Sequence, residues 1–391
     1  MAKMKGRANG EGSIYEYPKG SGVWFAQITL ENGRPKRRRA ASQKAARVKL
    51  RELLQELAQG VDLSAKQPTL AQWCTIWLDT FAANLRPNIK QDYRDVVRRY
   101  IAGAAIGKKR LDALTPAQIQ AWVNDLCRQI SPRTKRPISA LTIRNAYARL
   151  HKALAVAVTQ GYIARNVADD IELPPLAPSE IHPLDFEQAA VFLEAVADHR
   201  WAALYRLALN LGMREGELLG LTWDAIDFKA KTIRIGQQLR RVPGPDGKKV
   251  FALQITKPAR VLVLTLDDDL IAVLKAHRKL QAEERLLLGP AWKDTLGLVF
   301  VSETGAPIHA SCIIAHFKNS LAAAQLPDIR FHDLRHTAAT LMLADRVPLV
   351  TVSKILGHSS PAITAMIYAH ALDSSKASAI AGLSHRLRRA E

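Results

Sequence analysis

The chain has 391 residues, a formal net charge of +20 at pH 7, 48% hydrophobic residues and 24% charged residues. It is too long for one ordinary hydrophobic core, so we expect two or three domains, and its hydrophobic share excludes a disordered protein. The positive charge attracts polyanions and favours nucleic acid as a partner, although a basic protein with solvated lysines has the same balance.

Residues 1–60 are predicted to form a separate module of three strands and one helix. Apolar and polar residues alternate over 13–17 and 23–30, and a glycine-containing turn follows each stretch. A basic third strand and a helix from about Gln43 to Leu57 come next. Antiparallel strands can enter a major groove while basic side chains hold phosphates, but charge also protects an ordinary edge strand from aggregation. The candidate DNA-binding residues of this module are Arg34, Lys36, Arg37, Arg38 and Arg39.

Residues 61–67 are expected to be a linker, and an all-helical domain is predicted over residues 68–172. Thr115 is a preferred N-cap residue, and it precedes a proline, which is favoured at the first helical position. Basic residues along these helices favour a DNA clamp with Arg144 as a candidate contact, although basic helix faces are often only solvated. Of the four expected helices, the first starts at Leu70, the second contains Tyr93, Val96, Val97 and Tyr100, the third starts at Pro116, and the fourth runs from Leu141 to Val158.

A proline-rich stretch at 173–179 cannot continue a helix and marks the next boundary. Beyond it we predict a mixed, mainly helical domain over residues 180–391, with a small antiparallel sheet within a β-rich stretch at 232–266. The whole chain is therefore expected to be a multidomain α+β protein. Helices of this last domain are predicted at about 186–197, 200–221, 267–287, 311–325, 333–345, 348–357 and 361–369.

Four short segments of this last domain suit chemistry at a phosphodiester. Arg214 follows a glycine turn, and Arg335 follows His332 by three positions. A glycine-histidine turn at His358 and a tyrosine at Tyr368 complete the series. A phosphodiester repels a nucleophile, and negative charge builds further in the pentavalent transition state. Fixed guanidiniums bind such oxygens bidentately and without deprotonation.

The histidines and the tyrosine have complementary requirements. The pKa of an unperturbed phenol is about 10, so Tyr368 needs positive neighbours or a base in order to attack. The pKa of an unperturbed imidazole is near 6.5, which suits His332 and His358 to proton transfer or to a hydrogen bond with phosphate. Tyr205, the nearest upstream tyrosine, lies in a predicted helix and is expected to be a core residue.

In order and spacing, the four segments resemble the tyrosine recombinases of the phage-integrase family. The resemblance implies that Tyr368 is the nucleophile and that Arg214 and Arg335 bind the scissile phosphate. It further implies that His332 accepts the tyrosine proton, while His358 bonds a phosphate oxygen or helps to place it. Glu217 is expected to orient Arg214, although a salt bridge between the two could be the only role of Arg214. His336 and His370 are expected to surround these residues without an assigned role.

The resemblance also implies a lysine that protonates the leaving 5′ oxygen, and Lys257 occupies the matching place. The stretch from Lys257 to the next strand, 261–264, is a few residues shorter than the usual pattern, which leaves Lys248 and Lys249 as alternatives. A second departure concerns the interval between His358 and Tyr368, which is one residue longer than the interval commoner in the family. A helix that starts at Pro361 would absorb that residue.

The implied reaction is transesterification without ATP, metal or any other cofactor. Attack on the scissile phosphate leaves a 3′-phosphotyrosyl enzyme and a free 5′ hydroxyl, and the 5′ hydroxyl of a partner strand then attacks that bond. Two such rounds, through a Holliday junction within a homotetramer, would integrate or excise a mobile element. The implied partners are double-stranded DNA attachment sites and DNA-bending and directionality factors of the host or of the element.

The domain order resembles integrases with an amino-terminal arm-binding module. By this resemblance, residues 1–60 bind arm sites, residues 68–172 bind the core site and residues 180–391 form the catalytic domain. The alternatives are a chromosome-dimer resolvase, which normally lacks the arm module, a type IB topoisomerase, and a non-catalytic DNA-binding regulator on a recombinase scaffold. The tail after Tyr368 is expected to dock on a neighbouring protomer or on its own domain.

The chain start and the cysteines indicate a cytoplasmic protein. The first residues contain no apolar core of a signal peptide, and no apolar run approaches the roughly 18 residues of a membrane-spanning helix. No membrane partner is therefore expected. The three cysteines form no C-x-x-C pair, so we expect neither disulfides nor a zinc site but buried, reduced side chains. These cysteines are Cys74, Cys127 and Cys312.

Overall fold

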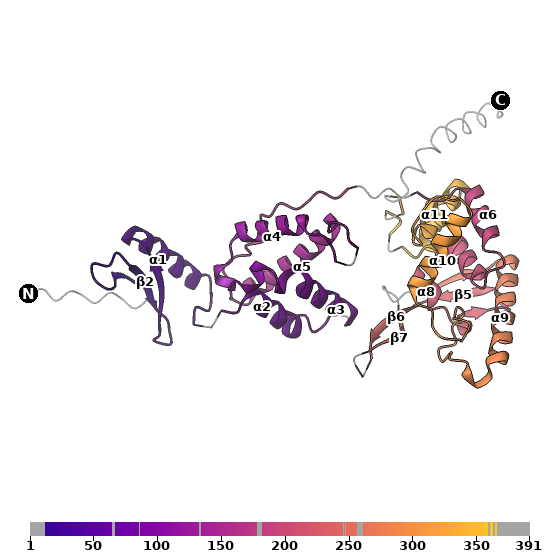
Figure 1. Cartoon of the computed structure of the whole chain (residues 1–391), viewed down its shortest axis with the longest axis horizontal. Helices are drawn as coiled ribbons and strands as arrows, with labels where there is room; N and C mark the ends of the chain where they lie inside the picture. Colours follow the sequence, from indigo (N-terminus) through magenta and orange to yellow (C-terminus); the bar gives the residue numbers. More distant parts are fainter. Residues whose placement is uncertain are drawn as a thin grey trace, which may run out of the picture. The chain divides into compact units, whose positions relative to one another are not determined.

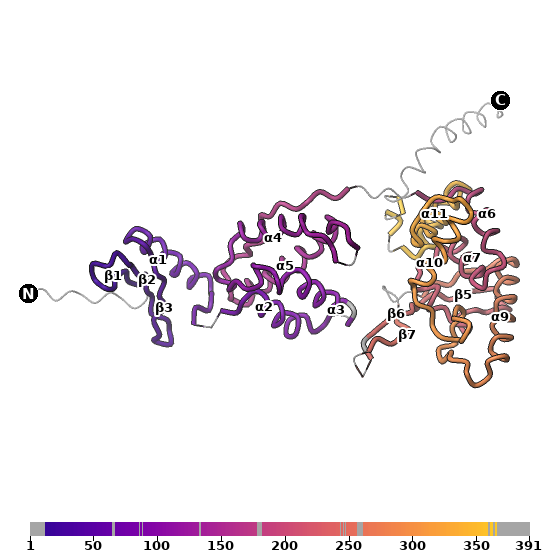
Figure 2. Tube along the Cα trace, in the orientation of Figure 1, coloured from indigo at the N-terminus to yellow at the C-terminus, as the bar shows by residue number. Residues whose placement is uncertain are grey.

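The computed structural model describes residues 12–64, 67–85, 87–132, 134–177, 182–244, 246, 248–255, 261–358, 360–362, 364 and 365. The chain divides into two units, Met1–Pro178 and Ser179–Glu391, each with its own internal contacts. Figure 1 labels some of the helices and strands of both units, and Figure 2 follows the same chain as a tube. The multidomain α+β fold predicted from the sequence is confirmed.

The first unit begins with a three-stranded antiparallel sheet covered on one face by a helix (Figure 1). Side chains alternate between the faces of a strand, so Ala26 and Ile28 of the central strand pack with Leu53 of the helix in a small buried core. The three strands and the helix agree with the prediction. The elements are β1 (Ser13–Glu16), β2 (Trp24–Thr29), β3 (Pro35–Ala40) and α1 (Gln43–Ala58).

The basic residues of β3 lie on both faces of this sheet. Arg38 donates to both carboxylate oxygens of Glu56 on α1, at 3.0 and 2.7 Å. Lys36 donates at 2.8 Å to a backbone carbonyl oxygen in the segment after α1. Arg37 and Arg39 alternate with these two residues and are exposed. The basic side chains of β3 therefore do not share one face, because strand alternation turns every second side chain towards the helix.

The segment after α1, which we expected to be a linker, is packed over its first residues. Val61 and Leu63 are 6% and 5% exposed and belong to the same buried cluster as the sheet and α1. The backbone N–H of Asp62 donates to the carbonyl oxygen of Gly161 at 2.9 Å, which ties this segment to the helical part of the unit. Two apolar residues at alternate positions thus pack this segment onto the sheet module, and the backbone hydrogen bond of Asp62 between them joins it to the helical part of the unit.

The helical part of the first unit has its own core. Trp73 and Leu150 are fully buried, and the Trp73 indole N–H donates to the Ala153 carbonyl oxygen at 2.8 Å. The Thr115 side chain accepts from the backbone N–H of Gln118, as the predicted cap requires. All four predicted helices are present, and each of the first two continues directly into a short π-helical segment. The elements are α2 (Leu70–Ile76), η1 (Trp77–Phe81), α3 (Pro87–Val96), η2 (Val97–Ala102), η3 (Ala105–Lys108), η4 (Leu111–Ala113), α4 (Pro116–Arg128) and α5 (Ala140–Thr159).

The second unit contains a three-stranded antiparallel sheet in the order β4-β5-β8 and a separate two-stranded hairpin, β6-β7. The hairpin is inserted between β5 and β8 and projects from the body of the unit in Figure 1. The small antiparallel sheet expected in this region is confirmed. The strands are β4 (Ile226–Asp227), β5 (Thr232–Ile235), β6 (Gln237–Pro243), β7 (Lys249–Ile255) and β8 (Leu262–Thr265).

The helices of the second unit follow the predicted order with one correction. The predicted helix at 200–221 is two helices, because Gly212 adopts φ +58 and ends the first of them. Glycine takes this left-handed conformation without steric cost. The helix predicted at 361–369 extends beyond the described residues. The elements are α6 (Phe186–Ala195), α7 (Ala202–Leu211), α8 (Glu215–Leu219), η5 (Trp223–Ala225), α9 (Asp268–Leu288), η6 (Gly289–Ala291), α10 (Ala310–Ala323), α11 (Asp333–Ala344) and α12 (Leu349–Ile355).

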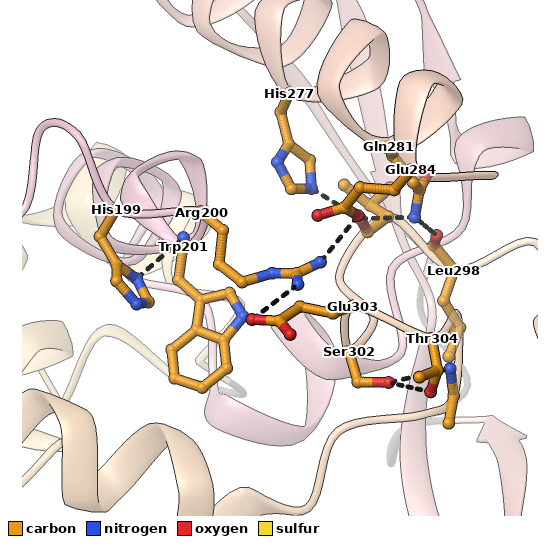
Figure 3. Close-up of polar contacts among 12 residues, drawn as sticks. His199, Arg200, Trp201, His277, Gln281, Glu284, Leu298, Ser302, Glu303 and Thr304 are labelled. Atoms are coloured by element: carbon orange, nitrogen blue, oxygen red, sulfur yellow. Dashed lines mark hydrogen bonds and ion pairs between the residues drawn. The ribbon is translucent and has the colours of Figure 1, made fainter. Parts of the chain in front are cut away.

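Buried aromatic and ionic contacts hold α7 in place. Tyr205 is fully buried, as predicted for a core residue. At the start of α7, Arg200 pairs with Glu284 of α9 at 3.0 Å, as Figure 3 shows. Gln281, one turn earlier on α9, donates to a backbone carbonyl oxygen of the neighbouring 298–304 segment at 3.0 Å (Figure 3). The helix that leads into the first motif is therefore anchored at its far end.

The structure bears on the expectations about the cysteines and about membrane-spanning helices. Cys74 is buried, but Cys127 and Cys312 are exposed. The expectation of three buried cysteines is therefore wrong for two of them. Among the helices in the described part of the chain, none is both long enough and apolar enough to cross a membrane.

Candidate active site

Arg214 stands immediately before α8 and is held by Glu217. One Glu217 carboxylate oxygen accepts from the backbone N–H of Arg214 at 2.9 Å, and the other accepts from its guanidinium at 2.8 Å. Glu217 is 7% exposed, whereas the Arg214 side chain is 44% exposed. The buried carboxylate thus fixes the base of a guanidinium that stays open to solvent, which is the contact that an orienting role for Glu217 requires.

Arg335, on α11, joins three of the four sequence motifs. Its Nη1 donates at 2.6 Å to the carbonyl oxygen of Gly212, which lies 123 residues away in the chain. Its Nη2 donates to the carbonyl oxygen of Leu356, next to the glycine-histidine turn. The residue is only 4% exposed. Because a buried guanidinium needs acceptors around it, Arg335 draws the two glycine turns together around itself.

His358 follows a helix end that requires a glycine. The backbone N–H of Gly357 donates to the Lys354 carbonyl oxygen, and that of His358 donates to the Ser353 carbonyl oxygen, both at 3.0 Å. These two hydrogen bonds are those of the Schellman motif, a helix end that favours a residue in the left-handed conformation. Gly357 is that residue, with φ +63. The His358 ring is placed further by a 2.7 Å hydrogen bond between Nδ1 and the Thr364 hydroxyl.

Three histidine rings lie close to these arginines. Burial, then Arg335 and Arg214, lower the pKa of His358 to about 4. Burial, then the neighbouring His332, lower the pKa of His336 to about 4. Burial and Arg335 also lower the pKa of His332. All three rings are therefore mainly uncharged at neutral pH and able to accept a proton or a hydrogen bond.

Arg214, Arg335 and His358 line one cleft of about 620 Å³. Thr351 and Lys354 of α12 also line the cleft. Val261 and the apolar residues of β8 form another part of its wall. Among the described residues of its lining, Glu217 is the single carboxylate, and Arg214 already engages both of its oxygens. The cleft therefore has more fixed positive than negative charge, as an anion-binding site requires.

Two predicted catalytic residues, Lys257 and Tyr368, lie outside the residues that the structure describes, as does His370. The alternatives to Lys257, Lys248 and Lys249, are exposed beside the turn of the β6-β7 hairpin. The foot of this hairpin packs on α8, where a side chain added at Gly220 would lie 2.5 Å from the backbone of β6. The hairpin is therefore seated on the helix that follows Arg214.

Two contacts of the site were not anticipated from the sequence. Thr364 bonds to His358, and Lys354 lines the cleft with the arginines. Lys354 precedes His358 by four positions, but α12 ends at Ile355 and Gly357 is left-handed, so helical spacing does not relate the two residues and did not indicate Lys354. Nothing in the local sequence marks Thr364, because its contact depends on how the chain turns after the helix.

The described groups can bind and polarise an oxyanion. Two guanidiniums from distant segments offer directional N–H donors, and their positions are fixed by a carboxylate and by backbone carbonyl oxygens. Such preorganised donors stabilise charge that develops in a transition state, because they need not reorganise as it forms. Neutral histidines next to them can bond further oxygens or take up a proton.

Two family models match this chain. The model described as the phage integrase family matches residues 183–375, which contain all four motifs. The model described as the phage integrase N-terminal SAM-like domain matches residues 69–127, within the helical part of the first unit.

Relatives align over nearly the whole chain. A protein of Caldanaerobacter subterraneus subsp. tengcongensis named "Tyrosine recombinase XerC-like" is 32% identical, and the match covers 90% of this chain and 92% of the relative. A protein of Saccharopolyspora erythraea named "Integrase" is 25% identical, with 94% of each chain covered. The ICEBs1 integrase of Bacillus subtilis is 23% identical, with 82% of this chain and 83% of the relative covered.

Solved structures share the fold. The Tn1549 transposon integrase in complex with transposon right end DNA superposes with a TM-score of 0.66 at 20% identity, covering 80% of this chain and 98% of that chain. A lambda integrase tetramer bound to a Holliday junction gives a TM-score of 0.51 at 17% identity, covering 93% of this chain and 96% of that chain.

Proposed function

The chain belongs to the phage integrase family of tyrosine recombinases, and we propose that it cuts and rejoins DNA through Tyr368 at the cleft formed by Arg214, Arg335 and His358. The observation that carries this proposal is the convergence of the motifs. Arg335 donates to Gly212, two residues before Arg214, and to Leu356, two residues before His358. Segments far apart in the sequence thus meet around one anion-binding cleft.

In the proposed reaction, the Tyr368 oxygen attacks the scissile phosphorus while His332 takes the phenolic proton. The phosphorus–5′ oxygen bond breaks, and the leaving oxygen receives a proton from Lys257. Arg214 and Arg335 bind the non-bridging oxygens as their charge increases, and His358 donates or positions a further bond. In the second step, the 5′ hydroxyl of a partner strand gives its proton to Lys257 and attacks the phosphotyrosyl phosphorus. The bond to Tyr368 breaks, and the tyrosine oxygen takes back the proton from His332. The phosphotyrosyl bond stores the energy of the broken one, so ATP is not consumed.

The substrate we propose is the double-stranded attachment site of a mobile element, acted on in the cytoplasm. Relatives named integrase, with nearly full mutual coverage, support integration and excision. The solved integrases with this fold are bound to DNA, one of them as a tetramer on a Holliday junction. We propose the same homotetramer here, assisted by DNA-bending and directionality factors. A chromosome-dimer resolvase is the alternative within the family.

For the sheet module we propose DNA contact through the face that α1 leaves uncovered. Strand register places Arg37 opposite Gln27 and Arg39 opposite Phe25. The Arg37 Nε donates to the Gln27 side-chain oxygen at 2.7 Å, which sets an arginine and an amide side by side. Such a face can combine phosphate and base contacts. The exposed Arg34 lies at the turn before β3 and belongs to the same proposal.

The other candidate DNA contacts of the first unit have internal partners. Arg38 bonds to Glu56 of α1, and Lys36 bonds to the Leu63 carbonyl oxygen in the segment after α1. The Arg144 guanidinium donates to the Pro174 carbonyl oxygen at 2.8 Å. We infer that these three side chains stabilise the unit and do not contact DNA directly.

A nicked duplex carrying the crossover sequence tests the proposed function. Cleavage releases a short fragment that carries the free 5′ hydroxyl, and once this fragment is lost it cannot reseal the phosphotyrosyl bond, so the covalent intermediate is trapped. We expect a protein–DNA adduct that forms equally well with EDTA and is absent in Tyr368→Phe. Tyr205→Phe is the matched control, because it removes a phenolic oxygen from the buried core and should leave the adduct in place. An adduct in Tyr368→Phe would show that the nucleophile is wrong, and no adduct with the wild-type chain would overturn the function.

A further inference from the structure

Lys354 is an exposed lysine inside the cleft of Arg214, Arg335 and His358. Its backbone is fixed, because its carbonyl oxygen accepts the Gly357 N–H in the turn that ends α12. The side chain therefore leaves the wall of the cleft from a fixed backbone position, four residues before His358. Thr351, one helical turn before Lys354, lines the same wall.

No carboxylate among the described residues pairs with Lys354. In the same unit, Lys231 pairs with Asp268 at 2.6 Å and Lys279 pairs with Glu283 at 3.9 Å. Of the described residues that line the cleft, Glu217 alone is a carboxylate, and Arg214 already engages it. Lys354 thus stands near two guanidiniums without a counter-charge, an arrangement that repels in the free protein and is relieved by a bound polyanion.

The pKa of His358 supports this view of the cleft. Burial is the main cause of its fall to about 4, and the next causes are the positive charges of Arg335 and Arg214. The field in the cleft is therefore positive before DNA enters. A lysine in the last turn of a helix also complements the helix dipole, but that role needs no position inside the cleft.

We propose that Lys354 is a further phosphate-binding residue of this site, whose ammonium group contacts a non-bridging oxygen of a phosphate that neighbours the scissile one on the same strand. This inference rests on the proposed function. The two arginines and His358 supply the donors for the scissile phosphate itself, and a lysine elsewhere on the wall of the same cleft suits the next phosphate of a strand lying in the cleft. Lys354 is a positioning residue in this role, since it holds the strand and takes no part in the proton transfers.

The experiment compares Lys354→Gln with Lys279→Gln in the full-length chain, on the nicked duplex that traps the covalent adduct. Both variants remove one exposed lysine charge from the second unit, and Lys279 does not line the cleft. For Lys354→Gln we expect roughly ten-fold weaker DNA binding and a salt dependence of log affinity that is shallower by about 0.9, the value for one lost phosphate contact. Lys354→Arg should retain most of the wild-type binding, and Lys279→Gln should match the wild type.

A substrate series locates the contact. Methylphosphonates, which are uncharged, replace the phosphates beside the scissile one, one position at a time. At one position the replacement should weaken the wild type about as much as the lysine substitution does, and should cost Lys354→Gln almost nothing further. Additive losses at every position would overturn the proposal, because a dipole or folding role of Lys354 does not single out one phosphate.

A third substrate separates positioning from acid catalysis. A bridging sulfur at the 5′ position makes a leaving group that needs no proton, so it restores a variant that lacks the general acid. We expect no restoration of Lys354→Gln, and restoration would overturn the positioning role. If the wild type forms no adduct on any substrate, the proposed function fails. If the wild type reacts and Lys354→Gln behaves identically, only this inference fails.

Discussion

Glu217 holds Arg214 with both of its carboxylate oxygens, one on the backbone N–H at 2.9 Å and one on the guanidinium at 2.8 Å. A single buried side chain therefore fixes both the backbone position of Arg214 and the orientation of its guanidinium. The backbone contact caps α8, and the side-chain contact leaves the rest of the guanidinium in the cleft. Capping of α8 and orientation of the Arg214 guanidinium thus depend on the same side chain, Glu217.

The first prediction concerns this pair. Glu217→Gln keeps one acceptor oxygen but replaces the other with an NH₂ group, which cannot accept from Arg214. We expect the arginine to lose its orientation and the rate of adduct formation to fall about 10- to 100-fold, since small misplacements at a reacting centre have effects of this size. Single-turnover kinetics on the nicked duplex measures the rate. Glu215→Gln, two residues earlier, is the control, and equal losses in both variants would contradict the prediction.

The second prediction concerns the Gly212 turn. Gly212→Ala places a side chain at φ +58, where it would overlap Leu356. Gly297→Ala is the matched control, because Gly297 has φ +64 and a side chain there would meet nothing within 4 Å. Backbone strain alone costs about 1 kcal/mol, so we expect the Gly212 variant to lose a few kcal/mol of unfolding free energy and the control about one. Urea unfolding measures both.

The adduct assay completes this comparison. Gly212→Ala should also react more slowly, because Gly212 accepts the hydrogen bond from Arg335. The control variant should react at the wild-type rate. Equal destabilisation of the two variants would mean that the contact with Leu356 is unimportant.

The third prediction concerns pH. The pKa of His336 is lowered to about 4 by burial and by His332, against about 6.5 in an unfolded chain. Between these values the unfolded state binds more protons, so the free energy of unfolding falls as pH decreases from 6.5 towards 4, and is unaffected by this group above 6.5. Asp333, which faces His336, opposes the shift, whereas Arg330 and Arg335 reinforce it.

Urea unfolding at a series of pH values tests this prediction. We expect His336→Asn to reduce the loss of stability between pH 6.5 and 4, by on the order of 1–3 kcal/mol. Carboxylates titrate in the lower part of the same window, so the difference between variant and wild type is the quantity to compare. A variant that loses stability as steeply as the wild type would contradict the lowered pKa.

The fourth prediction separates the two faces of β3. Arg38→Ala removes a paired contact with Glu56 and should lower the stability of the first unit by about 1–3 kcal/mol. Arg39→Ala, on the exposed face, should leave stability unchanged and make the salt dependence of arm-site binding shallower by about 0.9. Thermal unfolding and binding at several salt concentrations distinguish these effects. Loss of stability in Arg39→Ala alone would reverse the assignment of the faces.

Much of the fold could be predicted from local chemistry. Thr115 followed by proline begins α4 as expected, and the alternation around Ala26 and Ile28 gives a strand with one buried face. The prediction of one continuous helix at 200–221 was wrong at Gly212. A glycine within an apolar helical pattern is compatible either with a continuing helix or with a helix end. The overlap that a side chain at Gly212 would make with Leu356 shows why the chain turns there.

The sequence by itself determined the residue types of the site, because the order of an arginine, a His-x-x-Arg motif, a glycine-histidine turn and a tyrosine is visible without coordinates. It also determined the basic character of the chain. Only the tertiary structure decided which cations serve which purpose. Lys36, Arg38 and Arg144 have internal partners, whereas Lys354 lines the cleft with Arg214 and Arg335. The physical reason is that composition records charge, while the role of a charge depends on which acceptors the fold brings within reach.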